Sequence, residues 1–174
     1  MELCVLVKNG VVAFSHGLAR LELWVCKFLI VFFAGLLLVN VLLRYVLSSP
    51  LYFAEELAVY TLIWMAFLAS SVAMANRQMI SLTFIADYLS GPARTALNIL
   101  VEALMCAVSL VLMYVSFRWV NSGAVAFEQA LTLGTLKWPF YSIMPLFFTL
   151  TSFHTFANVL YLLGGDAGRN EETS

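Results

Sequence analysis

The chain has 174 residues, of which 63% are hydrophobic and only 11% are charged. That charged fraction is about half of what soluble domains carry, which excludes an ordinary soluble protein. The net charge of −1 gives no reason to expect nucleic acid as a partner, because nucleic-acid-binding domains concentrate positive charge. The three cysteines lack Cys-x-x-Cys spacing and predict neither a disulfide framework nor a zinc site.

Four long apolar stretches fill most of the sequence. They cover roughly residues 23–47, 51–75, 96–120 and 138–163. Each is long enough for a helix to cross about 30 Å of hydrocarbon, and a helix satisfies its own backbone groups in lipid. We therefore predict an all-α membrane protein with a single domain of four transmembrane helices. Residues 165–174 are predicted to form a disordered tail.

The positive charges predict an orientation. Six lie on the side of the termini and three on the other side: Lys8, Arg20, Lys27, Arg77, Arg94 and Arg169 against Arg44, Arg118 and Lys137. Cytoplasmic loops carry the excess of lysine and arginine. We expect a multi-pass membrane protein with both termini in the cytoplasm.

The connections between the spans predict smaller elements. Ser48-Ser49-Pro50 predicts a tight turn that makes the first two helices an antiparallel hairpin. Residues 79–90 carry Ile80, Phe84 and Tyr88 at four-residue spacing, which is typical of a short amphipathic helix in the membrane interface. Residues 11–22 show a weaker pattern of the same kind. The apolar connection 121–137 is expected to lie against the membrane or another protein.

Four aromatic residues fall near the predicted helix ends: Trp24, Tyr52, Trp119 and Trp138. Tryptophan and tyrosine are enriched at both membrane interfaces, where their rings are part apolar and part polar. We expect these four side chains to anchor the helices at the interfaces.

Adjacent carboxylates occur near the outer end of the second span, at Glu55 and Glu56. Arg44 lies at the matching end of the first span. We predict that Arg44 pairs with one of these glutamates and fixes the hairpin. The alternative is a site for an ion or a substrate carboxylate, although such sites usually lie nearer the midplane.

Two further ionisable residues, Glu102 and His154, lie well inside the apolar spans. Burying such groups in lipid is costly, so they normally face protein or water. Antiparallel third and fourth helices place Glu102 level with His154, and Asn98 level with Asn158. We predict a polar seam, formed by these four residues, between the two helices or toward a partner subunit. The alternative is that Glu102 and His154 form a proton relay.

The first two spans carry an ordered series of residues: Asn40, Arg44-Tyr45, the Ser-Pro turn, the segment 51–57 that contains Glu55 and Glu56, Trp64, and Asn76-Arg77. This series resembles the small membrane subunit (DctQ-like) of tripartite ATP-independent periplasmic (TRAP) transporters. The family usually has a His-Ile pair at the inner end of helix two. This chain has Met79 in place of the histidine and keeps Ile80.

The resemblance implies a division of labour among three proteins. A large membrane subunit (DctM-like) carries the sodium and substrate sites and moves as an elevator, and a soluble periplasmic protein delivers an organic acid. The small subunit is expected to brace the fixed scaffold and to offer part of the periplasmic docking surface. Sodium is thus expected in the large subunit, and no cofactor or metal in this one.

No nucleophile with its base, metal-ligand cluster or phosphate-binding loop is visible in the sequence, so we predict no enzyme. Two rival functions are considered. One is a b-type haem anchor of a respiratory complex, which would need His16 and His154 to converge. The other is a self-sufficient, proton-coupled exporter that uses Glu55 or Glu56.

Overall fold

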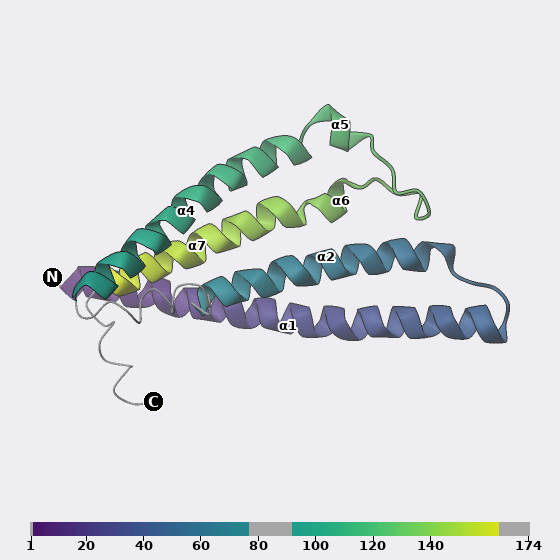
Figure 1. The fold of residues 1–174 in the computed structure, drawn as a ribbon, viewed down its shortest axis with the longest axis horizontal. Coiled ribbons are helices and arrows are strands. Elements are labelled where there is room, and N and C mark those ends of the chain that lie inside the picture. Colours follow the sequence, from purple (N-terminus) through teal and green to yellow (C-terminus); the bar gives the residue numbers. More distant parts are fainter. Residues whose placement is uncertain (1, 77–91, 164–174) are drawn as a thin grey trace.

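The computed structural model describes residues 2–76 and 92–163, and this part is helical almost throughout (Figure 1). Four helices are long and apolar enough to cross a membrane, which confirms the predicted fold class. The predicted interfacial helix at 79–90 and the predicted tail at 165–174 lie outside the described residues. The elements are α1 (Glu2–Val46), α2 (Tyr52–Ala75), α4 (Pro92–Val120), α5 (Gly123–Ala126), α6 (Trp138–Tyr141) and α7 (Ile143–Leu163).

The long helices form two antiparallel pairs, α1 with α2 and α4 with α7 (Figure 1). Helix α7 also packs against α1 and α2. The pairs lie close together at the end of the bundle that holds the N-terminus. They diverge toward the other end, here named the loop end, where the connections 47–51 and 121–137 lie. Helix α7 is therefore the element that joins the two pairs.

Helix α1 has 45 residues without a break, which corresponds to about 67 Å, or twice the thickness of the hydrocarbon layer. The separate interfacial helix expected at residues 11–22 is wrong, because these residues continue into the first span. No proline interrupts them. Their buried residues Ser15, Ala19 and Glu22 share the face that meets α7, so packing stabilises the extension.

The turn between α1 and α2 is closed by Asn40. Its Oδ1 accepts a 2.9 Å hydrogen bond from the Leu51 backbone N–H, one of the groups that a helix start leaves unsatisfied. Ser48 has a φ of 49°, and the Ser49 N–H donates to the Leu43 carbonyl at 3.1 Å, so the chain turns back at the end of α1. The predicted tight hairpin is thus present.

Replacing Asn40 with alanine is expected to lower the free energy of unfolding by about 1 kcal/mol, because the Leu51 amide loses its acceptor. Thermal unfolding of the chain in detergent measures this. Asn121→Ala is the matched control, since Asn121 is exposed directly after α4 and its side chain donates to the Phe117 carbonyl in the last turn of that helix. Equal losses in the two variants would contradict a role for Asn40 in closing the hairpin.

The fourth span is divided between α6 and α7, which meet at Ser142. Pro145 accounts for the break: it has no N–H to donate, and its ring crowds the carbonyl four residues earlier, at Tyr141. Beyond the break, α7 runs against α4, with Cys106 Sγ 3.8 Å from the Ser152 carbonyl oxygen. Trp119 packs on Tyr141, with ring centroids 5.1 Å apart. These contacts confirm that the third and fourth spans are antiparallel.

Candidate functional site

A buried polar cluster joins α1 to α7. His154 is completely buried; its Nδ1 lies 2.7 Å from Ser15 Oγ and its Nε2 lies 2.9 Å from Glu22 Oε1. Glu22 is itself only 2% exposed. Both ring nitrogens therefore have partners, and a carboxylate and an imidazole form an ion pair or a charged hydrogen bond inside the bundle.

Serine, histidine and glutamate are also the residue types of a hydrolytic triad. Here all three side chains are under 5% exposed, so no substrate reaches the Ser15 hydroxyl. Glu22 Oε2 is buried and has no hydrogen-bond partner among the residues that the structure describes, an arrangement that costs free energy. The cluster therefore connects α1 to α7 and does not form an accessible catalytic site.

The predicted polar seam divides between two places. Asn158 donates to Glu102 Oε1 at 3.4 Å and to the Met74 carbonyl at 3.0 Å, which links α7 to both α4 and α2. His154 turns instead toward α1. Asn98 lies half-buried one turn before Glu102. Glu102 and His154 lie at the same depth in the bundle, yet the hydrogen bonds of His154 go to α1, and Glu102 accepts one from Asn158. Depth alone does not predict these partners, because α7 packs against three helices.

The contacts of Ser15 and Glu22 with His154 were not predicted from the sequence, although the spacing of the buried residues of α1 indicates them. Ser15, Ala19, Glu22 and Cys26 follow one another at spacings of four, three and four residues, which places them on one face of a helix. All four are buried. A carboxylate on a face of otherwise small residues indicates close packing and a buried partner.

Glu56 holds the loop that connects α5 to α6. Its carboxylate accepts hydrogen bonds from the backbone N–H groups of Leu131, Thr132 and Leu133 at 3.2, 2.8 and 3.2 Å. The Thr132 hydroxyl adds a bond at 2.5 Å, and the Tyr60 hydroxyl adds one at 3.3 Å. Successive amides that converge on one anion form a backbone nest. Glu56 thus ties α2 to residues that lie about 75 positions later.

The structure does not form the ion pair predicted for the hairpin. Arg44 and Glu55 are exposed, and no ion pair joins Arg44 to Glu55 or Glu56 within the part of the chain that the structure describes. The reason is that Glu56 faces the loop of the other helix pair. A long exposed arginine gains little from an ion pair in water.

The connection 121–137 folds into a small hairpin at the loop end. Gln129 and Leu136 form an antiparallel bridge, and Gly134 supplies the positive φ of 62° that the turn needs. Lys137 Nζ lies 2.7 Å from Glu128 Oε1, and this hydrogen bond raises the pKa of the lysine. Leu131 at the tip is 93% exposed, and Phe127 before it is 83% exposed.

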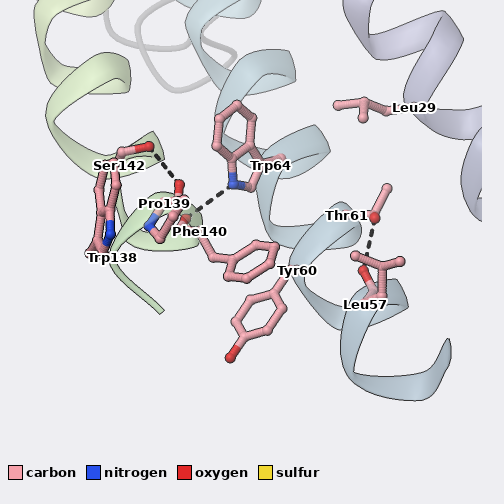
Figure 2. A pocket seen from close by; sticks show the side chains of 9 residues that line it. All are labelled: Leu29, Leu57, Tyr60, Thr61, Trp64, Trp138, Pro139, Phe140 and Ser142. Atoms are coloured by element: carbon pink, nitrogen blue, oxygen red, sulfur yellow. Dashed lines mark hydrogen bonds between the residues drawn. The ribbon is translucent and has the colours of Figure 1, made fainter. Parts of the chain in front are cut away.

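An apolar pocket of about 460 Å³ opens between α1, α2 and α6 (Figure 2). Trp64 closes one side, and its Nε1 donates to the Phe140 carbonyl at 3.0 Å. Tyr60 stacks on the Phe140 ring with centroids 4.2 Å apart. The lining residues are Leu29, Leu57, Tyr60, Thr61, Trp64, Trp138, Pro139, Phe140 and Ser142.

The hydroxyl groups of this pocket are already engaged inside the chain. Thr61 donates to the Leu57 carbonyl and Ser142 to the Pro139 carbonyl, while Tyr60 donates to Glu56. An organic acid needs strong hydrogen-bond donors or cations around its carboxylate. The lining of the pocket is therefore unsuited to such a ligand.

Three of the four predicted aromatic anchors lie at the loop end: Tyr52, Trp119 and Trp138 begin or end helices there. Trp24 does not lie near a helix end, because α1 continues for more than 20 residues on its N-terminal side. It is 72% exposed, and its ring lies 5.2 Å from Lys27 Nζ. The expectation that Trp24 lies near a helix end is wrong, and its anchoring at the membrane interface stays a prediction.

The geometry disfavours a haem site. Both nitrogens of His154 have partners, and His16 is exposed on α1, so no ring nitrogen of His154 is left to ligate iron. Among the residues that the structure describes, no group of three or more His, Cys, Asp and Glu side chains could hold a metal ion.

One comparison with known proteins identifies a family. The model of the DctQ component of the tripartite ATP-independent periplasmic transporters matches residues 17–165, which is most of the chain and includes all four spans. A comparison with curated proteins gives no match.

Proposed function

We propose, since this chain belongs to the DctQ family of tripartite ATP-independent periplasmic transporter components, that it is the small accessory membrane subunit of such a transporter. It braces a larger membrane subunit that takes up an organic acid with sodium coupling. A periplasmic binding protein delivers the acid. In this arrangement the substrate and sodium sites lie in the other two polypeptides.

One observation supports the bracing role most directly: several polar side chains of the chain connect one helix or loop to another. His154 and Glu22 join α1 to α7, Asn158 joins α7 to α4 and α2, and Glu56 joins α2 to the loop before α6. A transport site needs polar groups that are available to cargo, usually beside broken helices near the midplane. Contacts between every pair of neighbouring elements instead favour a rigid scaffold.

The proposed orientation places both termini in the cytoplasm and the loop end in the periplasm of the bacterial inner membrane. The exposed Phe127 and Leu131 are then available to the periplasmic partner or to the large subunit. The Glu56 contacts hold Leu131 in place without using its side chain. This supports a docking role for the loop end.

Co-purification tests the proposed function. The tagged full-length chain is expressed with the large membrane subunit of the same transporter, extracted in mild detergent and analysed by mass spectrometry. We expect the two subunits in equal amounts. Recovery of the chain as a homo-oligomer, with the large subunit absent, would overturn the proposal.

A further inference from the structure

Three residues of α2 contact one later segment of the chain. Glu56, Tyr60 and Trp64 succeed one another at spacings of four residues, so they lie on one side of the helix. We name these three the contact edge of α2, and we name residues 128–141 the bridging segment. Glu56 and Trp64 also belong to the ordered series of residues found along the first two spans. Two separate positions of that series thus meet the same segment.

The contact edge follows the bridging segment from the hairpin to α6. Glu56 accepts the hydrogen bond of the Thr132 N–H at 2.8 Å. One turn further along α2, Tyr60 stacks on the Phe140 ring, with centroids 4.2 Å apart and planes 13° from parallel. After one more turn, Trp64 Nε1 donates to the Phe140 carbonyl at 3.0 Å (Figure 2). The hairpin therefore lies nearer the start of α2, and α6 lies nearer its middle.

The bridging segment also holds itself together. The Ala130 N–H donates to the Thr135 carbonyl at 2.8 Å, and the Lys137 N–H donates to the Glu128 carbonyl at 2.9 Å. The Phe140 N–H donates to the Lys137 carbonyl at 3.0 Å, which joins the hairpin to α6. Since none of these bonds involves α2, the segment is expected to keep its shape when its contacts with α2 are lost.

Both ends of the bridging segment belong to the α4–α7 pair. At one end, α4 leads through α5 into the segment, and α5 contacts α4. At the other end, α6 leads into α7, and Tyr141 packs on Trp119 of α4 with ring centroids 5.1 Å apart. The segment is therefore part of the α4–α7 pair and rests on α2 of the other pair. It makes this connection toward the loop end, where the two pairs diverge (Figure 1).

Direct packing of the long helices holds the two pairs together away from the loop end. Cys26 of α1, Leu68 of α2 and Ile143 of α7 form a buried hydrophobic cluster. Further from the loop end, His154 of α7 contacts Glu22 of α1. These contacts do not involve the bridging segment. The pairs are thus able to move apart at the loop end while this packing persists.

We propose that the contact edge of α2 is a latch for the bridging segment. When it is engaged, it fixes the separation of the two helix pairs at the loop end. When it is released, the pairs spread there and the apolar pocket between them is exposed. The latch lies within this chain and does not depend on the proposed partners.

The lining of the pocket supports this arrangement. Helix α2 contributes Leu57 and Thr61, and the bridging segment contributes Trp138, Pro139 and Phe140. The pocket thus lies between the two bodies that the latch joins. Thr61 is only 6% exposed while the latch is engaged, so its accessibility reports on opening.

The distance between the two pairs tests the proposal. Val46→Cys on α1 and Val115→Cys on α4 place spin labels at exposed positions in the full-length chain without its native cysteines, and double electron–electron resonance measures their separation. Glu56→Ala combined with Trp64→Phe is expected to shift the distances to longer values and to broaden them. Labels at Val46→Cys and Val59→Cys, within the α1–α2 pair, are expected to keep their distance.

Two further variants sharpen this measurement. Glu56→Ala alone frees the hairpin but leaves Tyr60 and Trp64 on α6, so the distance between the pairs is expected to stay unchanged. Trp24→Phe, which changes an exposed tryptophan of α1, replaces Trp64→Phe in the matched control. The inference is overturned if the combined variant leaves the distance between the pairs unchanged, or if the labels within the α1–α2 pair separate equally.

Thiol accessibility provides the second readout. With Thr61→Cys as the single cysteine, a charged methanethiosulfonate reagent is expected to react at least about tenfold faster when the latch is removed by Glu56→Ala with Trp64→Phe. The helical circular dichroism should stay unchanged, which distinguishes opening from unfolding. An unchanged rate would mean that the pocket stays covered without the latch and would contradict the proposed opening.

Discussion

Replacing His154 with alanine is expected to lower the free energy of unfolding by about 3–5 kcal/mol, the cost of leaving one member of a buried, hydrogen-bonded carboxylate–imidazole pair without its partner. The Glu22 carboxylate would then have neither oxygen paired, at 2% exposure, and Ser15 would lose its partner. Unfolding in mixed micelles, followed by circular dichroism, measures the loss.

His16→Ala is the matched control, because His16 is an exposed histidine on the same helix as Ser15 and Glu22. A double variant, Glu22→Leu with His154→Leu, tests whether the loss of stability comes from leaving one polar group unpaired. It is expected to be more stable than either single change, since neither group is left buried and unpaired. If His154→Ala cost no more than His16→Ala, the ion pair would not hold α1 to α7.

Replacing Glu56 with alanine is expected to release the loop around Thr132. Three consecutive amides and one hydroxyl lose a shared acceptor, so the backbone there opens without opening of the bundle. Hydrogen exchange of Leu131, Thr132 and Leu133, followed by mass spectrometry, is expected to accelerate at least about tenfold. The four long helices should keep their protection.

The adjacent Glu55→Ala supplies the comparison for Glu56. It has the same charge and position on the same helix but is exposed, without a hydrogen bond to the loop in the part of the chain that the structure describes. We expect it to leave exchange in the loop unchanged. Similar acceleration by both substitutions would show that charge at the end of α2, rather than the nest of amides, keeps the loop ordered.

The two variants also separate structure from partner binding. Because Glu55 faces outward, a loss of large-subunit or binding-protein association in Glu55→Ala, with the loop intact, would identify it as an intermolecular contact. A loss that occurs only in Glu56→Ala would follow from the disordered loop. The paired glutamates are thus expected to have different roles despite their adjacency.

The spans and their antiparallel order could be predicted because long apolar runs report directly on membrane crossing. The end of a span is harder to predict. Helix α1 begins far earlier than its apolar stretch, since residues 11–22 gain their stability from packing on α7. Hydropathy reports contact with lipid and is insensitive to contacts between helices. The sequence therefore predicts a separate helix at 11–22 and a helix end near Trp24, where the structure has one continuous helix.

The partners of the polar residues are harder to predict than the ends of the spans. Closeness along the hairpin predicts that Arg44 pairs with Glu55 or Glu56, whereas Glu56 bonds to Thr132 in another connection and Glu55 is exposed. Likewise, Glu102 and His154 lie level but partner different helices. Spacing predicts the depth and the face of a side chain. The neighbour that this face meets depends on how the two helix pairs pack, which the sequence of one helix does not contain.

Transport into proteoliposomes tests the central claim most directly. Vesicles receive the large membrane subunit alone, this chain alone, or both, with the purified binding protein loaded with its organic acid outside and a sodium gradient across the membrane. The account predicts uptake only when both membrane subunits are present. Uptake or efflux by vesicles that contain this chain and no other membrane protein would contradict it.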